Sequence, residues 1–359
     1  MTLPSPQNIS IEKVRYHDLN ELEKIFTGAF GEEVDAAIIR QRIHRIRQFY
    51  FVLLPLSSVS LWLKNLFSIY ICRVEGKVAG FMQVSFFNRG QLHLDYIAIN
   101  KHYRGQGLGT LILRKLIDGA ARNNYDIILE VRSDNPAYYL YKRLGFISQA
   151  QILHYDKDIE RNVPARFTTK HRLGGFRKRN NNDWRQIYEL YLKSLPLKLH
   201  QIARREIREY NPSLFTKSLE WFKNYMMGNV KQQYVLEKHG KIVGTLELQS
   251  YLKAHSHIMN VMLDHEHEYL RERVYLQALY LLRTYKRGTI STTIYRDGVE
   301  KQQALEKLGF IETEAYYLMF RPAHLQNKVV ESDRCFNDHT NKSLSQNRNM
   351  HNYDCRLKS

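Results

Sequence analysis

The sequence predicts an α/β (α+β) protein made of two consecutive copies of one domain, each a mixed, mostly antiparallel sheet flanked by helices. Three observations indicate this fold class. Short segments with strand periodicity alternate with amphipathic helical segments along the chain. Similar stretches recur in the two halves at a fixed separation. A glycine-rich turn also joins a strand directly to a helix at Tyr103 to Thr110.

The repeat is visible in two unrelated pairs of stretches. One pair is typical of two strands joined by a tight glycine turn, and the other of a helix followed by a closing strand. The pairs are VEGKVAGFMQV (Val74 to Val84) with KHGKIVGTLEL (Lys238 to Leu248), and KRLGFISQAQI (Lys142 to Ile152) with EKLGFIETEAY (Glu306 to Tyr316). Corresponding glycines, such as Gly80 and Gly244, are 164 residues apart in both pairs, which predicts a tandem duplication.

Within each copy we expect a strand, two helices, two hairpin strands, a third strand, a helix, another strand, a helix and a closing strand. The predicted boundaries are an N-terminal extension at 1–8, a first domain at 9–162, a second at 163–321 and a polar tail at 322–359. The tail has no apolar period and is predicted to be disordered.

The composition supports two packed domains, because 43% of the 359 residues are hydrophobic. The net charge of +18 predicts an acidic partner for the basic surface, and nucleic acid, a membrane surface, a polyphosphate cofactor and an acidic protein all qualify. The three cysteines are too few for a disulfide framework, and residues 1–20 lack the apolar core of a signal peptide. These features predict a cytoplasmic protein.

One apolar window, Phe49 to Leu63, needs a separate interpretation. It is shorter than the roughly 20 apolar residues of a spanning helix, and Pro55 interrupts it. We therefore expect no transmembrane span. A buried pair of helices, or a surface that lies against lipid or a partner, is the alternative.

The glycine-rich turn predicts an anion site. Gly105, Gly107 and Gly109 allow the backbone to turn with its amides inward, and the helix that follows directs its N-terminus to the same place. A phosphate group is therefore the expected ligand.

Arg104 to Gly109, RGQGLG, also fits the [QR]-x-x-G-x-[GA] acyl-CoA signature, between the strand LHLDYIAI and the closing segment YKRLGF. By these motifs the first copy, over most of Ile11 to Asp158, resembles the GCN5-related N-acetyltransferase (GNAT) superfamily. The segments DIILEVRSDN and LYKRLGF are similar to those of bacterial ribosomal-protein alanine N-acetyltransferases.

The resemblance implies two tandem GNAT-like domains, of which 9–162 is catalytic, and acetyl-CoA as co-substrate without a metal. It implies transfer of the acetyl group to a primary amine, of a protein N-terminus or a small molecule, by direct attack in a ternary complex. The implied cofactor-binding residues are Ile97, Ala98, Ile99, Arg104, Gly105, Gln106, Gly107, Leu108, Gly109, Thr110 and Asn135. Asn135 lies one residue closer to Tyr141 than the family pattern has it, so Asp134 is an alternative.

The same resemblance implies two catalytic residues. Glu130 matches the catalytic glutamate and is expected to take the proton of the amine through a water. Tyr141 matches the tyrosine that donates its proton to the departing sulfur. His93, on the preceding strand, is an alternative base.

The second copy has none of these groups at the corresponding positions. The loop glycines, Glu130, Asn135 and Tyr141 correspond, 164 residues on, to Tyr269, Arg271, Arg273, Ile294, Val299 and Leu305. We therefore expect a degenerate GNAT-like domain that shapes the acceptor site. Four histidines there, from His255 to His267, leave a metal site as an alternative. For the whole chain, the alternative function is a non-catalytic acyl-CoA-binding regulator or adaptor, with ribosome or nucleic-acid association.

Overall fold

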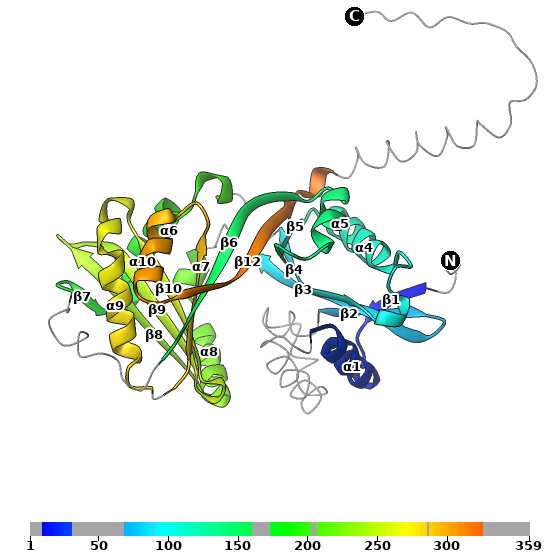
Figure 1. Ribbon diagram of the computed structural model, residues 1–359, viewed down its shortest axis with the longest axis horizontal. Helices are drawn as coiled ribbons and strands as arrows, with labels where there is room; N and C mark the ends of the chain where they lie inside the picture. The colour runs from blue at the N-terminus through cyan, green and yellow to red at the C-terminus, as the bar shows by residue number, and fades with distance from the viewer. Residues whose placement is uncertain are drawn as a thin grey trace, which may run out of the picture.

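The computed structural model describes residues 9–30, 68–88, 90–159, 173–200, 202, 207–285 and 287–325. The predicted extension at 1–8, the apolar window at 49–63 and the tail beyond 325 lie outside these ranges. Twelve strands of the described chain form one sheet in the order β1-β2-β3-β4-β5-β12-β6-β11-β10-β9-β8-β7 (Figure 1). No helix in these ranges is long and apolar enough to cross a membrane.

The two halves have the same succession of strands, and from their second strands onward the same order of helices and strands. In the first half these are β1 (Ile9–Lys13), α1 (Leu19–Phe30), β2 (Ile69–Val74), β3 (Lys77–Asn88), β4 (Gln91–Ile99), η3 (Lys101–Tyr103), α4 (Leu108–Arg122), β5 (Asp126–Arg132), α5 (Ala137–Arg143) and β6 (Ile147–Asp158). In the second they are β7 (Phe176–Lys178), α6 (Trp184–Ser194), η7 (Leu197–Leu199), α7 (Ile207–Tyr210), α8 (Leu214–Met227), β8 (Asn229–Lys238), β9 (Lys241–Tyr251), β10 (Ser256–Leu263), η9 (His265–Leu270), α9 (Arg271–Leu282), β11 (Thr289–Tyr295), α10 (Val299–Lys307) and β12 (Ile311–Arg321), with η10 (Ala323–Leu325) after them.

The last strands of the two halves change places. β12 pairs antiparallel with β5 of the first half, and β6 pairs antiparallel with β11 of the second half. β6 and β12 also pair with each other, so the strand order has a two-fold pseudo-symmetry centred between them. In Figure 1 these two strands run between the two lobes. The predicted fold class is confirmed, but the sequence did not predict that the two sheets are continuous.

Helices cover both faces of the first half of the sheet (Figure 1). On one face, α4 buries Ile112 and Leu113 against Leu94, Leu129 and Met319. The opposite face packs against α1, and the core between them contains the buried side chains of Leu19, Leu22, Phe26, Ile71 and Phe81. Since Met319 belongs to β12, the second half contributes to the core of the first.

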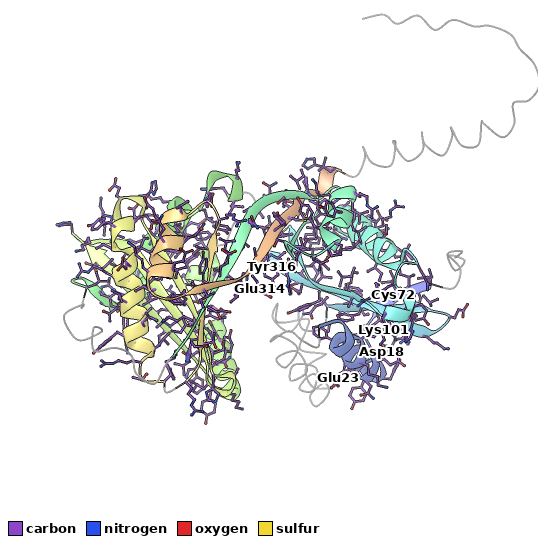
Figure 2. All side chains as sticks on the ribbon, in the orientation of Figure 1. Asp18, Glu23, Cys72, Lys101, Glu314 and Tyr316 are labelled. Atoms are coloured by element: carbon purple, nitrogen blue, oxygen red, sulfur yellow. The ribbon has the colours of Figure 1, made fainter. Side chains whose placement is uncertain are left out.

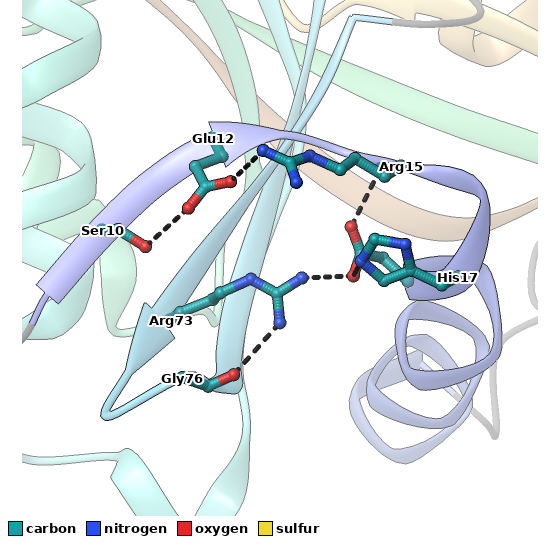
Figure 3. A network of polar contacts seen from close by, with 7 residues as sticks. Ser10, Glu12, Arg15, His17, Arg73 and Gly76 are labelled. Atoms are coloured by element: carbon teal, nitrogen blue, oxygen red, sulfur yellow. Dashed lines mark hydrogen bonds and ion pairs between the residues drawn. The ribbon is translucent and has the colours of Figure 1, made fainter.

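The junction between the first strand and first helix of each half is fixed by a buried aspartate. Asp18 accepts the backbone N–H of Arg15 at 2.9 Å and is bonded to the Arg73 guanidinium, which also donates to the Gly76 carbonyl (Figure 3). In the second half Asp183 accepts from the backbone of Asn180 and pairs with Arg177 at 2.8 Å. Both halves therefore start with the same capping arrangement.

Candidate active site

The strands β4 and β5 pair at one end and separate at the other. Their parallel ladder covers only Gln91–Leu94 with 126–129. Asp95 is an extra residue in β4, because the register with β3 passes from Leu94–Val84 directly to Tyr96–Gln83. After this bulge β4 continues along β3, while the end of β5 continues along β12. We call the two diverging segments, residues 95–99 and 130–132, the β4–β5 fork.

The fork presents backbone groups of β4 that are not used in the ladder with β3. Asn100 donates its N–H to the Ala79 carbonyl of β3 at 2.8 Å. Because successive residues of a strand direct their backbone groups to opposite edges, Ile97 and Ile99 direct theirs into the fork. Ala98 pairs with Phe81 and directs its backbone groups to β3, and its contact with a cofactor stays a prediction.

The glycine loop has the conformation that its glycines allow. Gly105 and Gly107 have φ values of 76° and 74°, in the left-handed region, and α4 starts at Leu108. The N–H groups of its first turn, Leu108 to Thr110, have no acceptor within the helix and point out of its N-terminus. This end of α4 follows the fork directly in the chain, and it carries the partial positive charge of the helix dipole.

Two loop side chains are bound to the loop itself. Arg104 donates from Nε to the Ile99 carbonyl at 3.2 Å, and Gln106 donates to the His102 carbonyl at 3.2 Å. The predicted cofactor residues Arg104 and Gln106 therefore brace the turn between the fork and α4.

The second half has an ion pair where the first has the loop. No residue from Asp264 to Arg273 has a positive φ, and η9 runs straight into α9. Arg271, which corresponds to Gly107, is 4% exposed and donates to both carboxylate oxygens of Glu268, at 2.5 and 2.8 Å. Its guanidinium also donates to the Tyr275 hydroxyl. The second half therefore offers a phosphate neither the glycine turn nor the free helix N-terminus that the first half has.

Glu130 lies on β5 at the start of the fork and is exposed. Its neighbours Leu129 and Val131 pack on the α4 side, so Glu130 faces the opposite side of the sheet with Ile128. The negative charge of Glu130 acts on His93 of β4, on the same side.

His93 is held by a chain of side chains that the sequence analysis missed. Its Nδ1 is 2.8 Å from Asp95 Oδ1, and Ser85 donates its hydroxyl to the other oxygen of Asp95. Burial lowers the pKa of His93, but the hydrogen bond to Asp95 and the charges of Asp95 and Glu130 outweigh it and raise the pKa above 6.5. The H-x-D spacing on a strand was the available signal, but the bulge at Asp95 was not predictable.

Tyr141 lies on α5 and is 6% exposed. Its ring packs against Phe146 at 5.7 Å and belongs to the α4-side core with Leu129 and Val131, on the face opposite to Glu130. Its hydroxyl makes no hydrogen bond with any residue that the structure describes. Burial raises the pKa of Tyr141 to about 12, so the hydroxyl keeps its proton at neutral pH and acts as a donor.

Asn135 and Asp134, the two candidate cofactor-binding side chains after β5, both make hydrogen bonds within their own turn. Asn135 accepts the backbone N–H of Ala137 at 2.9 Å, at the start of α5. Asp134 pairs with Arg132 through two contacts of 3.0 and 3.2 Å. Both side chains are exposed, but in this structure they stabilise the turn that leads into α5.

The histidines of the second half do not gather at one point. His257 is buried and contacts Ser250 at 2.8 Å, while the ring of His267 stacks on Tyr269. Within the described ranges, no three His, Cys, Asp or Glu side chains are placed to hold a metal ion.

Residues of the second half line the sheet beside Glu130. Leu318 of β12 is opposite Glu130 in the ladder and packs with Ile128, together with Leu199 and Ile202. Further along β12, Tyr316 donates to Glu314, whose other oxygen is 3.5 Å from Arg132 (Figure 2).

Part of this chain is similar in sequence to known acetyltransferases. Residues 40–146 match the model of the acetyltransferase (GNAT) family. An N-alpha-acetyltransferase from Sulfurisphaera tokodaii is 33% identical over 105 residues, which cover 25% of this chain and 63% of that protein. An uncharacterized N-acetyltransferase from Methanocaldococcus jannaschii, MJ1530, is 34% identical over 95 residues, covering 25% of this chain and 60% of it. The chain thus spans less than two thirds of both relatives.

Solved structures match both halves. A GCN5-related N-acetyltransferase from Sphaerobacter thermophilus has a TM-score of 0.59 at 15% identity, over 89% of this chain and 96% of that one. A tandem GNAT protein from the clavulanic acid biosynthesis pathway has a TM-score of 0.54 at 12% identity, over 88% and 98%. At these identities the likeness concerns the fold. Residues 40–146 are thus similar to GNAT acetyltransferases in sequence, and the chain as a whole has a GNAT-like fold.

Proposed function

We propose that this protein is an acetyl-CoA-dependent N-acetyltransferase whose first half is catalytic and whose acceptor is a primary amine. The observation that carries the proposal is the meeting of three features: the β4–β5 fork, the free N-terminus of α4, and Glu130 and Tyr141 on opposite faces of β5. A ligand chain that lies in the fork, in the plane of the sheet, is within reach of groups from both faces.

The residues of the fork and loop fit an acyl-CoA. The amide-rich pantetheine arm would pair with the backbone of Ile97 and Ile99, and the pyrophosphate would accept the amides of Leu108 to Thr110. Gly109 supports this fit. A Cβ built there meets only Ile99, at an ordinary 3.9 Å, so the fold itself does not require a glycine. Close approach of a ligand to the helix end gives a reason for one.

The acceptor amine must be neutral to attack the thioester carbonyl. An α-amino group with a pKa near 7.8 is about 14% neutral at pH 7, whereas a lysine near 10.4 is about 0.04% neutral. An N-terminal amine is therefore the easier substrate. The resemblance to ribosomal-protein alanine acetyltransferases and the relative named an N-alpha-acetyltransferase point to the same class. A small amine of similar pKa fits equally.

In the transfer, the amine nitrogen forms a bond to the acetyl carbon and the carbon–sulfur bond breaks. Glu130, through a water, takes the proton released by the nitrogen, and the His93–Asp95 pair on the same face accepts it onward. Tyr141 donates a hydrogen bond to the departing sulfur. Because its pKa lies above that of a thiol near 8.5, Tyr141 stabilises the thiolate chiefly as a donor.

The direct test is release of free CoA thiol from acetyl-CoA in the presence of peptides with free N-termini, small primary amines and N-terminally blocked lysine peptides. Turnover with an unblocked amine supports the enzyme. Tight acetyl-CoA binding without turnover on any acceptor would favour the acyl-CoA-binding regulator instead. The acidic partner of the basic surface and the cytoplasmic location stay predictions.

Glu130→Gln is expected to lower kcat by about 100- to 10,000-fold, the usual contribution of a general base. Affinity for acetyl-CoA should be retained, because Glu130 faces away from the loop. Loss of this charge also lowers the pKa of His93, so any residual activity should rise with pH through a lower apparent pKa than that of His93 in the wild type. A pH–rate profile and an NMR titration of His93 measure both effects. Glu272→Gln, an exposed carboxylate of α9, is the control, and equal rates for both variants contradict the base role.

Tyr141→Phe is expected to lower kcat by about 100-fold or more, because it removes the hydrogen-bond donor that stabilises the departing sulfur. The melting temperature should hardly change, since the ring stays in its core and the hydroxyl bonds no described residue. Tyr138→Phe is the matched control: its ring lies in the same cluster, 4.7 Å from Tyr317. A kcat within twofold of wild type for Tyr141→Phe would show that Tyr141 is only a core residue.

A further inference from the structure

Each exchanged strand carries a cation to the other half. Arg321, the last residue of β12, is 4% exposed and donates from Nε to the Leu144 carbonyl at 2.8 Å. A Cβ built on Gly145 lies 3.3 Å from the same nitrogen. On the other side of the pseudo-two-fold centre, the Nζ of Lys157, on β6, lies 2.9 Å from a Cβ built on Gly309. Both pairs are related by the repeat of 164 residues.

The turn that Arg321 binds ends the helix of Tyr141. Leu144 caps α5, and the N–H groups of Leu144 and Phe146 both donate to the Tyr141 carbonyl, at 3.0 and 3.1 Å. Gly145 has a φ of 85°, which reverses the chain after the helix. Because α5 has only seven residues, its geometry depends on tertiary contacts rather than on intrinsic helix stability.

The guanidinium is suited to this position. A cation at a helix C-terminus interacts favourably with the free carbonyls there, and an arginine holds its charge even when burial lowers its pKa, as it does for Arg321. Asp118 of α4 provides the opposing negative charge. Beyond Arg321, the N–H of Ala323 donates to Asp126 at the start of β5, which ties the end of β12 to the first half.

We propose that Arg321 is a positioning residue for the first half: by binding the end of α5 it holds the Tyr141 hydroxyl at the fork, so catalysis depends on the last strand of the second half. This inference rests on the proposed function. Lys157 lies at the corresponding turn, beside Gly309, where the side chain equivalent to Tyr141 is Leu305, and so it is near no reacting group.

The experiment compares Arg321→Met with Lys157→Met in the full-length chain. Arg321→Met should lower kcat by about 10- to 100-fold, the cost of misplacing a catalytic group by about an ångström, and leave the Kd for acetyl-CoA within about twofold. Lys157→Met should leave kcat unchanged. Arg321→Lys keeps a positive charge but lacks the planar guanidinium, so it should recover part of the rate. An equal loss of kcat in both methionine variants would show a general effect on stability and overturn the inference.

Two further readouts separate positioning from structure. In a Tyr141→Phe background, Arg321→Met should cause no further loss of kcat, because residues that act together are not additive. Hydrogen exchange of the peptide 137–146 should be faster in Arg321→Met and unchanged in Lys157→Met. The hydrogen-exchange readout does not depend on enzyme activity. Absence of turnover in the wild type would contradict the proposed function, whereas unchanged exchange in Arg321→Met would independently contradict the positioning role.

Discussion

Gly107→Arg is expected to weaken acetyl-CoA binding by at least about 100-fold, which corresponds to about 3 kcal/mol and to the loss of two charge-assisted hydrogen bonds. Gly107 has a left-handed φ of 74°, and its successors Leu108 to Thr110 form the free end of α4. An arginine strains this turn and places a long side chain where the phosphates would lie. The substitution reproduces the residue of the second half, Arg271, whose guanidinium is held by Glu268.

Calorimetric titration with acetyl-CoA measures the effect. The matched control is Gly240→Arg, in a hairpin turn of the second half with the same φ of 74° and no atom within 4 Å of a built Cβ. Both variants should be destabilised by about 1–2 kcal/mol through left-handed strain, and only Gly107→Arg should lose the ligand. Binding retained in Gly107→Arg would place the cofactor elsewhere in the chain.

A chain that ends at residue 162 is expected not to fold as a monomer, although it contains the whole family match at 40–146. It lacks β12, which covers the edge of β5 and fills the core with Leu318, Met319 and Phe320. Removing buried side chains of this kind costs about 2–5 kcal/mol each, so the sum reaches the roughly 5–15 kcal/mol that stabilises a typical domain. The exposed edge of β5 also invites pairing with other chains.

Size-exclusion chromatography with circular dichroism distinguishes the outcomes. We expect aggregates, or a dimer in which two copies of β6 take the places of β6 and β12. The control ends at residue 325, keeps every described strand, and should melt like the full chain. A folded monomer of 1–162 would show that the exchange of strands is dispensable.

The repeat and the glycine loop were predictable for physical reasons. A hairpin turn, a helix C-terminal glycine and a phosphate loop each need glycine at fixed positions, and these needs are legible in a sequence. The exchange of closing strands was not. The pairing segments are residues 152–158 of β6, along β11, and residues 316–321 of β12, along β5. Each follows a short helix at the end of its half, and the local pattern of a strand does not specify which sheet edge it pairs with.

Features of the site that depend on one residue type, such as the glycine loop, could be predicted from the sequence. Features that depend on the register between strands could not. The bulge at Asp95 separates β4 from β5 and results from the register between β4 and β3, which no local sequence pattern predicts. The same holds for Ala98, whose backbone direction depends on the pairing of Asn100 with Ala79. Ser85 joins Asp95 only across the β3–β4 ladder, and so it was missed.

The pseudo-symmetric sheet also bears on how such a chain can diverge. In a pair of identical chains with exchanged strands, every substitution appears twice, so one that removes a ligand loop removes both loops. A single gene that encodes both halves escapes this coupling. One half can replace its glycines with Tyr269, Arg271 and Arg273 while the other keeps them, provided that the exchanged strands still match. Selection on the second half then acts on its packing against the first half, so the two halves can become different while their strands stay paired.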